Sequence, residues 1–391
     1  MDPAYVDRLV DLGILKPGPG DAFSSGDVRR VRWVRGFEEA GVPLEGIAAA
    51  VRDGTLSFSY LDASAFDRFA GLSATTFQQA SDRMAIPLEL LGVVREALGF
   101  TSPAPEDLVR EDELLVMRAI EYQLSAGLRP AVIESWVRVC ADALRRIADT
   151  ETDWWRSDVE RPLLEGGMTE AEMLDAQAEV GSRMTPLIEQ AVMGIYRMQQ
   201  EHAWTKSSVE DIEAALEKAG LHSRLHRPPA MCFLDISGYT RLTEERGDRA
   251  AADLAAAVAG LVRRSSQEHG GQAVKWLGDG VMLYFPEPGQ AVLASLDMVE
   301  GVAVHALPPA RVGIHAGPVV FQEGDYFGRT VNVAARIGEY ARPGEVLVTQ
   351  DVVDAADGTA VRFVGIGEVE LKGVSGALPL HRAGRADGAA P

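Results

Sequence analysis

Phe233-Leu234-Asp235-Ile236-Ser237-Gly238-Tyr239-Thr240 is an apolar stretch that ends in a carboxylate and turns at Gly238. It follows Pro228-Pro229, which ends a long helical pattern, and the hydrophobic period changes there. Strand-like and helix-like runs then alternate, which predicts a sheet domain with helices packed on it. A carboxylate at a strand end beside a helix start is well placed to bind a hard cation such as Mg²⁺.

The expected elements of this domain follow from the periodicity and the turn signals. We expect helices at 247–269, 290–304 and 331–341, and strands at 230–234, 310–321, 346–349, 361–364 and 368–371, with two more inside 272–285.

A second segment, Lys275-Trp276-Leu277-Gly278-Asp279-Gly280-Val281-Met282, reads as two strands joined by a turn with Asp279 at its tip. The glycines on either side let the backbone approach a ligand closely. Two carboxylates brought together from a strand end and a hairpin tip make a site for two metal ions that bind phosphate.

The third segment contains Gly324-Asp325-Tyr326-Phe327-Gly328 and then Val331-Asn332-Val333-Ala334-Ala335-Arg336. Asn332 and Arg336 are four residues apart, so on a helix they project from one face. An amide beside a guanidinium suits an oxyanion or a charged transition state at phosphorus. Each segment alone is more often structural, since Gly-Asp-Gly is a common hairpin turn, but their order and separation favour one site.

Together, residues 228–383 resemble the catalytic domain of class III nucleotidyl cyclases, the adenylate and guanylate cyclase homology domain. The resemblance implies a ferredoxin-like βαββαβ core, so the expected fold class is α+β, with an all-helical N-terminal domain before it. It also implies a homodimer in which the metal aspartates come from one chain and Asn332 and Arg336 from the other.

The resemblance implies a role for each of these residues. Asp235 and Asp279 would bind two divalent ions, Mg²⁺ or Mn²⁺, and Ile236 would add a ligand through its backbone carbonyl. Lys275 and Asp325 would recognise the adenine ring, Asn332 would orient the ribose, and Arg336 would stabilise the transition state. Lys372 would contact the terminal phosphates.

The expected activity is therefore that of an adenylate cyclase, which converts ATP to 3′,5′-cyclic AMP and pyrophosphate. The hydrogen-bonding groups agree with adenine, because Lys275 can donate to N1 and Asp325 can accept from the 6-amino group, whereas guanine reverses both polarities. Two alternatives stay open: a cyclase for GTP or a pyrimidine nucleotide, and a nucleotide-sensing transcription regulator.

Residues 1–200 read as almost entirely helical, and 201–227 as a helical linker. The segment 5–60 resembles the later part of a MerR-type DNA-binding module, but only four residues precede it, too few for the helix-turn-helix. Basic residues do not outnumber acidic ones, with 7 Lys+Arg against 9 Asp+Glu in residues 1–60, so we do not expect nucleic-acid binding. We interpret the whole N-terminal half as a regulatory domain similar to those of pH-responsive actinobacterial adenylate cyclases.

Two regulators of that domain stay open. One is a proton, because His222 and His226 lie four residues apart just before Pro228. The other is a small apolar ligand, suggested by a Met- and Leu-rich stripe from Met184 to Met198, although such stripes are more often a packed core or a dimer seam.

The charge balance limits the partners further. The formal net charge of the 391 residues is −20, of which residues 228–391 carry −6 (14 Lys+Arg, 20 Asp+Glu) and residues 1–227 carry −14. This acidity disfavours nucleic acid and anionic membrane surfaces. Because no signal peptide and no long apolar run is present, we expect a cytoplasmic protein without membrane attachment, ending in a flexible tail at 384–391.

Overall fold

The computed structural model describes residues 3–386 apart from 19–21, 64–65, 67, 70, 222–227, 240–243, 246, 306 and 357–359. The chain divides into two compact units, Met1–Glu213 and Ala214–Pro391. The division falls inside one long helix, α9 (Glu170–Lys218), which continues past the domain end that the sequence analysis expected at residue 200. Each unit is described by itself.

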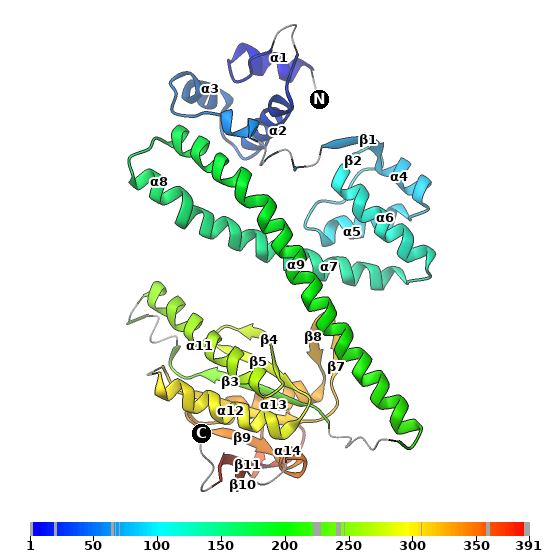
Figure 1. The fold of residues 1–391 in the computed structure, drawn as a ribbon, viewed down its shortest axis with the longest axis vertical. Coiled ribbons are helices and arrows are strands. Elements are labelled where there is room, and N and C mark those ends of the chain that lie inside the picture. The colour runs from blue at the N-terminus through cyan, green and yellow to red at the C-terminus, as the bar shows by residue number, and fades with distance from the viewer. Residues whose placement is uncertain are drawn as a thin grey trace. The chain divides into compact units, whose positions relative to one another are not determined.

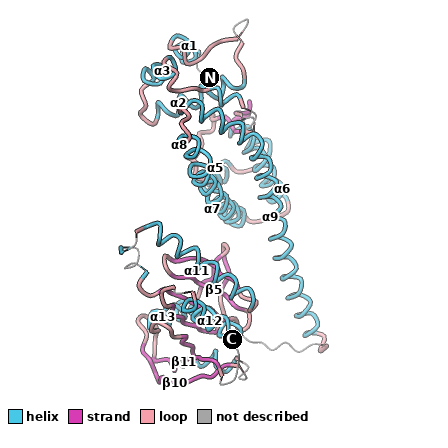
Figure 2. The backbone as a smooth tube through the Cα atoms, turned by 60° about the vertical axis from the view of Figure 1, so that its left-hand side comes forward, coloured by secondary structure: helices cyan, strands magenta, loops and turns pink. Residues whose placement is uncertain are grey.

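The first unit is built from helices, as Figure 2 shows. Its beginning contains α1 (Pro3–Asp11), α2 (Ser25–Glu39), α3 (Leu44–Arg52) and a short 3-10 helix (Ser59–Asp62). Helix α2 starts with a capping box, in which Ser24 and Asp27 satisfy each other's backbone N–H groups. Leu9, Val34 and Leu61 are fully buried between these helices.

A second group of helices in this unit packs around Phe77, Ile120 and Ile133. It consists of α4 (Phe77–Met84), α5 (Leu88–Ala97), α6 (Glu111–Ser125) and α7 (Pro130–Trp155), and α7 is followed by a π-helical turn (Arg156–Glu160) and α8 (Arg161–Glu165), which add no residue to this cluster. An antiparallel ribbon of β1 (Leu72–Thr76) and β2 (Leu108–Arg110) lies among them. The expectation of an all-helical domain is therefore wrong at this ribbon, which is too short to show a period in the sequence.

Helix α9 carries the predicted apolar stripe. Leu187, Ile195 and Met198 are each more than half exposed, so this part of the stripe does not form a core within the chain. Nearer its start, α9 packs on the first helices through Leu174 and Ala178.

The second unit contains the expected sheet. Among the described residues, seven strands pair in the order β10-β11-β9-β6-β3-β5-β4. Four of them with two crossover helices form the predicted βαββαβ core: β3 (Ala230–Ile236), α11 (Asp248–Glu268), β4 (Gln272–Leu277), β5 (Gly280–Phe285), α12 (Pro288–Val304) and β6 (Ala310–Ala316). The neighbours β6-β3-β5-β4 are all antiparallel. The ferredoxin-like fold is confirmed.

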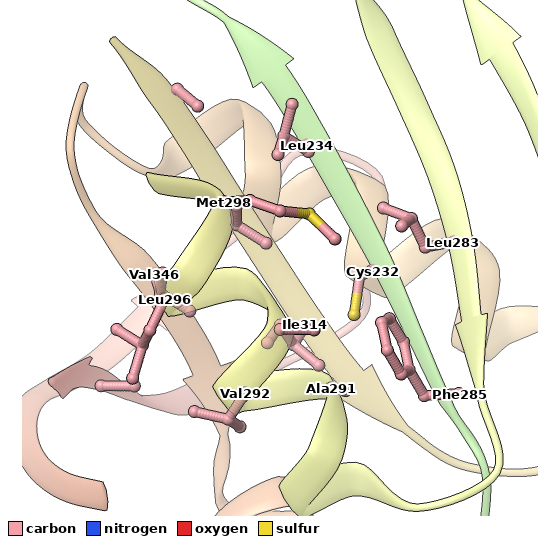
Figure 3. Packing of buried hydrophobic residues seen from close by; sticks show 14 of the residues in the cluster. Cys232, Leu234, Leu283, Phe285, Ala291, Val292, Leu296, Met298, Ile314 and Val346 are labelled. Atoms are coloured by element: carbon pink, nitrogen blue, oxygen red, sulfur yellow. The ribbon is translucent and has the colours of Figure 1, made fainter. Parts of the chain in front are cut away.

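The two faces of this sheet are covered differently (Figure 1). Alternate residues of β3, such as Cys232 and Leu234, join α11 and α12 in the main core, which Figure 3 shows from close by. Met231 points to the other face and packs with Met282 and with Ala334 of α13 (Arg329–Tyr340). The period of two along β3 thus separates the core under α11 and α12 from the face that carries α13 and the candidate site.

The remaining elements are three further strands of this sheet, a separate two-stranded hairpin and a short helix, and they correct three expectations. They are β7 (Val320–Gln322), β8 (Asp325–Phe327), β9 (Val346–Thr349), α14 (Gln350–Ala355), β10 (Val361–Glu370) and β11 (Ala377–Arg385). The expected strand 310–321 is two strands separated at Gly317–Val319. The expected strands 361–364 and 368–371 are one bulged strand, β10, which pairs with β11. Strand β11 runs through Arg385, so Gly384 and Arg385 do not belong to the tail expected at 384–391.

Candidate active site

Asp235 lies near the end of β3, directly opposite Arg311 of β6 in the strand register. The guanidinium of Arg311 donates to Oδ2 of Asp235 from Nε at 2.7 Å and contacts it from Nη2 at 2.6 Å. Its Nη1 also donates to the backbone carbonyl of Glu339 at 2.9 Å. Both side chains of the pair are about 30% exposed (29% and 30%), so solvent can reach them.

Asp279 lies in the turn between β4 and β5, where Gly278 adopts a positive φ of 66°. The N–H of Ile236 donates to the carbonyl of Asp279 at 3.3 Å, which ties the end of β3 to this turn. The pKa of Asp279 is raised because its carboxyl is partly buried and because the Asp235 carboxylate lies beside it. The structure therefore brings together Asp235, Ile236 and Asp279.

Lys275 and Asp325 also meet. Nζ of Lys275 donates to Oδ2 of Asp325, and the N–H of Tyr326 donates to Oδ1 of the same carboxylate at 2.8 Å. Asp325 begins strand β8, which pairs with β7 in a small hairpin outside the main sheet. The expected pair is thus formed between an edge strand of the sheet and a separate hairpin.

A β-bulge determines which way Lys275 points. In the pairing of β4 with β5, Gln272 faces Tyr284 and Lys275 faces Met282, so Val274 is an extra residue. Without a bulge, residues three apart would point to opposite faces; the extra residue places Lys275 on the same face as Gln272. That is the face of Met231 and Met282, on which Asp235 also lies.

Asn332 and Arg336 lie on α13, and Asn332 is exposed. Nη1 of Arg336 donates to both carboxylate oxygens of Glu339 at 2.6 Å. Because Arg311 contacts the backbone of Glu339, a chain of contacts leads from Asp235 through Arg311 and Glu339 to Arg336. Lys372 is exposed in the turn between β10 and β11, apart from this chain.

Arg311 and Glu339 were not predicted from the sequence. Arg311 is a single cation at the start of an apolar strand, and only the pairing register places it beside Asp235. A guanidinium next to the paired carboxylates gives the site a permanent positive charge, which suits a polyanionic substrate.

Comparison with known proteins agrees with this geometry. Residues 222–381 match the adenylate and guanylate cyclase catalytic domain, and residues 28–204 match the adenylate cyclase regulatory domain. The chain is 30% identical over 318 residues to a pH-sensitive adenylate cyclase of Mycobacterium tuberculosis, covering 79% of this chain and 77% of that protein.

Adenylate cyclases of two Streptomyces species are also similar. That of Streptomyces coelicolor is 28% identical over 272 residues, covering 69% of this chain and 68% of that protein. That of Streptomyces griseus is 28% identical over 285 residues, covering 69% and 65%.

The sheet has the ferredoxin-like strand order, and the carboxylates of Asp235 and Asp279 lie together at the ends of its strands. The chain belongs to the class III adenylate and guanylate cyclase family, with a regulatory domain in its N-terminal half and a catalytic domain in its C-terminal half. The enzyme class expected from the sequence is confirmed.

Two remaining expectations concern membrane attachment and regulation by protons. No helix among the described residues is long and apolar enough to cross a membrane. His222 and His226, on which the proton hypothesis rests, lie outside the described residues.

Proposed function

We propose that this enzyme converts ATP to 3′,5′-cyclic AMP and pyrophosphate. The observation that carries the proposal is the contact of Lys275 with Asp325 on the face of the sheet that carries α13. A donor beside an acceptor matches N1 and the 6-amino group of adenine, which are neighbouring atoms on one edge of the base. Guanine would leave both side chains without partners, which costs affinity. The three relatives described above are named adenylate cyclases, which supports this choice.

Asp235, Asp279 and the carbonyl of Ile236 fit two divalent ions. All are oxygen donors, which Mg²⁺ and Mn²⁺ prefer. Burial and the neighbouring Asp235 carboxylate raise the pKa of Asp279. Cations between the two carboxylates would relieve their repulsion, and Arg311 already provides one positive group at Asp235. Bound ions would lower the pKa of the ribose 3′-hydroxyl and neutralise charge on the phosphates.

The side chains then have separate tasks. Lys275 and Asp325 bind the base, and Arg311 and Lys372 offer positive charge to the phosphates. Asn332 orients the ribose so that its 3′-oxygen attacks the α-phosphorus in line with the departing pyrophosphate. Arg336 stabilises the charge that develops on the phosphoryl oxygens.

We further propose that the working enzyme is a homodimer under control of the N-terminal domain. The pair Asn332 and Arg336 would serve the site formed by Asp235 and Asp279 of a second copy, and a two-fold axis would create two such sites. The exposure of Asn332 supports this arrangement, since the side chain is available to a partner.

The test is incubation of the purified chain with Mg²⁺ or Mn²⁺ and each of the four nucleoside triphosphates, followed by chromatography of the products. We expect cyclic AMP as the main product. A main product of cyclic GMP or a cyclic pyrimidine nucleotide would refute the assignment of ATP, which was the alternative left open by the sequence.

A further inference from the structure

Two tyrosine rings stack beside the base-recognition pair. The rings of Tyr284 and Tyr326 have their centroids 4.5 Å apart and their planes 8° from parallel. Tyr284 belongs to β5 of the main sheet, whereas Tyr326 belongs to β8 of the separate hairpin. The stack therefore joins the hairpin that carries Asp325 to the sheet that carries Lys275.

Tyr326 is the better buried of the two, with 8% of its surface exposed. It packs with Met231, Met282 and Ala334 on the face of the sheet that carries α13. The side-chain amide of Gln272 donates to its hydroxyl at 3.4 Å, and the ring of Phe321 lies 5.0 Å away. Gln272 is also the cross-strand partner of Tyr284, so Tyr326 contacts two paired residues at the edge of the sheet.

Tyr326 is coupled directly to the carboxylate that precedes it. Its backbone N–H donates to Oδ1 of Asp325, while Lys275 donates to Oδ2. The position of the carboxylate is thus determined by the tyrosine on one side and by the lysine on the other. A displacement of the Tyr326 backbone would therefore move the Asp325 carboxylate relative to Lys275.

Other interactions of the hairpin are weak anchors. Strands β7 and β8 pair over only three residues each, and a short two-stranded ribbon is marginally stable alone. Val320 and Phe321 are about 60% exposed (60% and 62%), so β7 gains little from burial. The Lys275–Asp325 ion pair is partly solvated and adds little by itself. The packing of Tyr326 against Tyr284 and against the cluster of Met231, Met282 and Ala334 is therefore the main restraint on this hairpin.

We propose that the Tyr284–Tyr326 stack is a positioning element for base recognition, which fixes the separation of Asp325 from Lys275 and so sets the preference for adenine. The inference rests on the proposed function, since it assumes that these two side chains read the base. Tyr284 and Tyr326 act through Asp325 and are positioning residues.

The test compares steady-state kinetics with ATP and GTP for the full chain and for Tyr284→Leu. We expect a KM for ATP that is about 10- to 100-fold higher, a similar loss of the ATP-over-GTP ratio of kcat/KM, and a kcat with ATP within about threefold of the original. The kcat changes little because the substitution leaves Asp235, Asp279 and Arg336 in place.

Two controls separate positioning from simple packing. Tyr284→Phe keeps the ring and should keep the ATP-over-GTP ratio within about twofold, and Val320→Ala should do the same because Val320 takes no part in the stack. Gln272→Ala is a second test that does not endanger the core, since Gln272 is exposed. It removes the donor to the Tyr326 hydroxyl and should lower the ratio by about two- to fivefold.

Two outcomes overturn the inference: an unchanged ratio in both Tyr284→Leu and Gln272→Ala, or a fall in kcat/KM that is equal for ATP and GTP. Failure of the proposed function would look different. In that case the unaltered chain itself would show no preference for ATP.

Discussion

Gly313 lies where helix α13 comes closest to strand β6. A Cβ atom added to Gly313 would lie 2.1 Å from the backbone nitrogen of Gly338, 2.6 Å from the carbonyl carbon of Ile337 and 2.7 Å from the oxygen of Ala334. All three are backbone atoms of the helix, so no side chain can rotate away. Gly313→Ala must therefore push α13 off the sheet.

The size of the effect follows from these distances. Ordinary contact begins at 3.4 Å, so the separation at the nitrogen must grow by 1.3 Å, the difference between 3.4 Å and 2.1 Å. Overpacking of this kind costs about 1–3 kcal/mol of the free energy of unfolding. For a domain of this size, that lowers the Tm by about 2–12 °C. Because α13 carries Asn332 and Arg336, a shift of about 1 Å should also lower kcat by about 100-fold.

The assay is cyclic AMP formation at saturating ATP, together with thermal unfolding. The matched control is Gly384→Ala in β11 of the same sheet, where an added Cβ meets nothing within 4 Å. We expect the control to retain its rate and Tm. If Gly313→Ala has the rate and Tm of the unaltered chain, the reasoning that close packing of α13 positions the catalytic pair is wrong.

Three further variants probe the charges of the domain. Asp235→Ala should abolish turnover by removing a metal ligand while light scattering still shows a dimer; a rate above about 1% of the original would contradict the metal assignment. Glu339→Gln should raise kcat by at most about fivefold, because it frees Arg336 from an exposed ion pair that contributes about 0–1 kcal/mol. A fall in kcat would mean that Glu339 positions Arg336 instead. Burial lowers the pKa of His315 below 6.5, so the unfolded chain binds a proton first as the pH falls through that value. The free energy of unfolding should then decrease on acidification by up to about 1.4 kcal/mol per pH unit. In denaturant titrations at several pH values, His315→Gln should lack this part of the pH dependence. An equal pH dependence in the variant and the unaltered chain would contradict the prediction.

The sequence predicted the βαββαβ core because its strands and helices differ clearly in period and are separated by glycine and proline. It predicted poorly where an element depends on pairing with a distant segment. Strand β11 contains Pro379 and Gly384 and has no regular alternation, yet it pairs with both β9 and β10. Tertiary pairing overrides weak local preference in such strands.

The candidate site shows the same division. Asp235, Asp279, Lys275 and Asp325 could be recognised from their motifs, but the motifs do not contain the strand register that brings Arg311 to Asp235. Simple alternation from Gln272 would have placed Lys275 on the wrong face. Only the extra residue at the bulge corrects this, and a bulge has no reliable mark in a single sequence.

The central claim is that each active site takes Asp235 and Asp279 from one copy of the chain and Asn332 and Arg336 from another. The direct measurement is the cyclase activity of Asp279→Ala and Arg336→Ala, each alone and after the two are unfolded and refolded together in equal amounts. Each alone should be inactive. The mixture should recover about one quarter of the original specific activity, because half of the dimers are mixed and each mixed dimer has one intact site of two. A mixture no more active than its components would contradict the shared site.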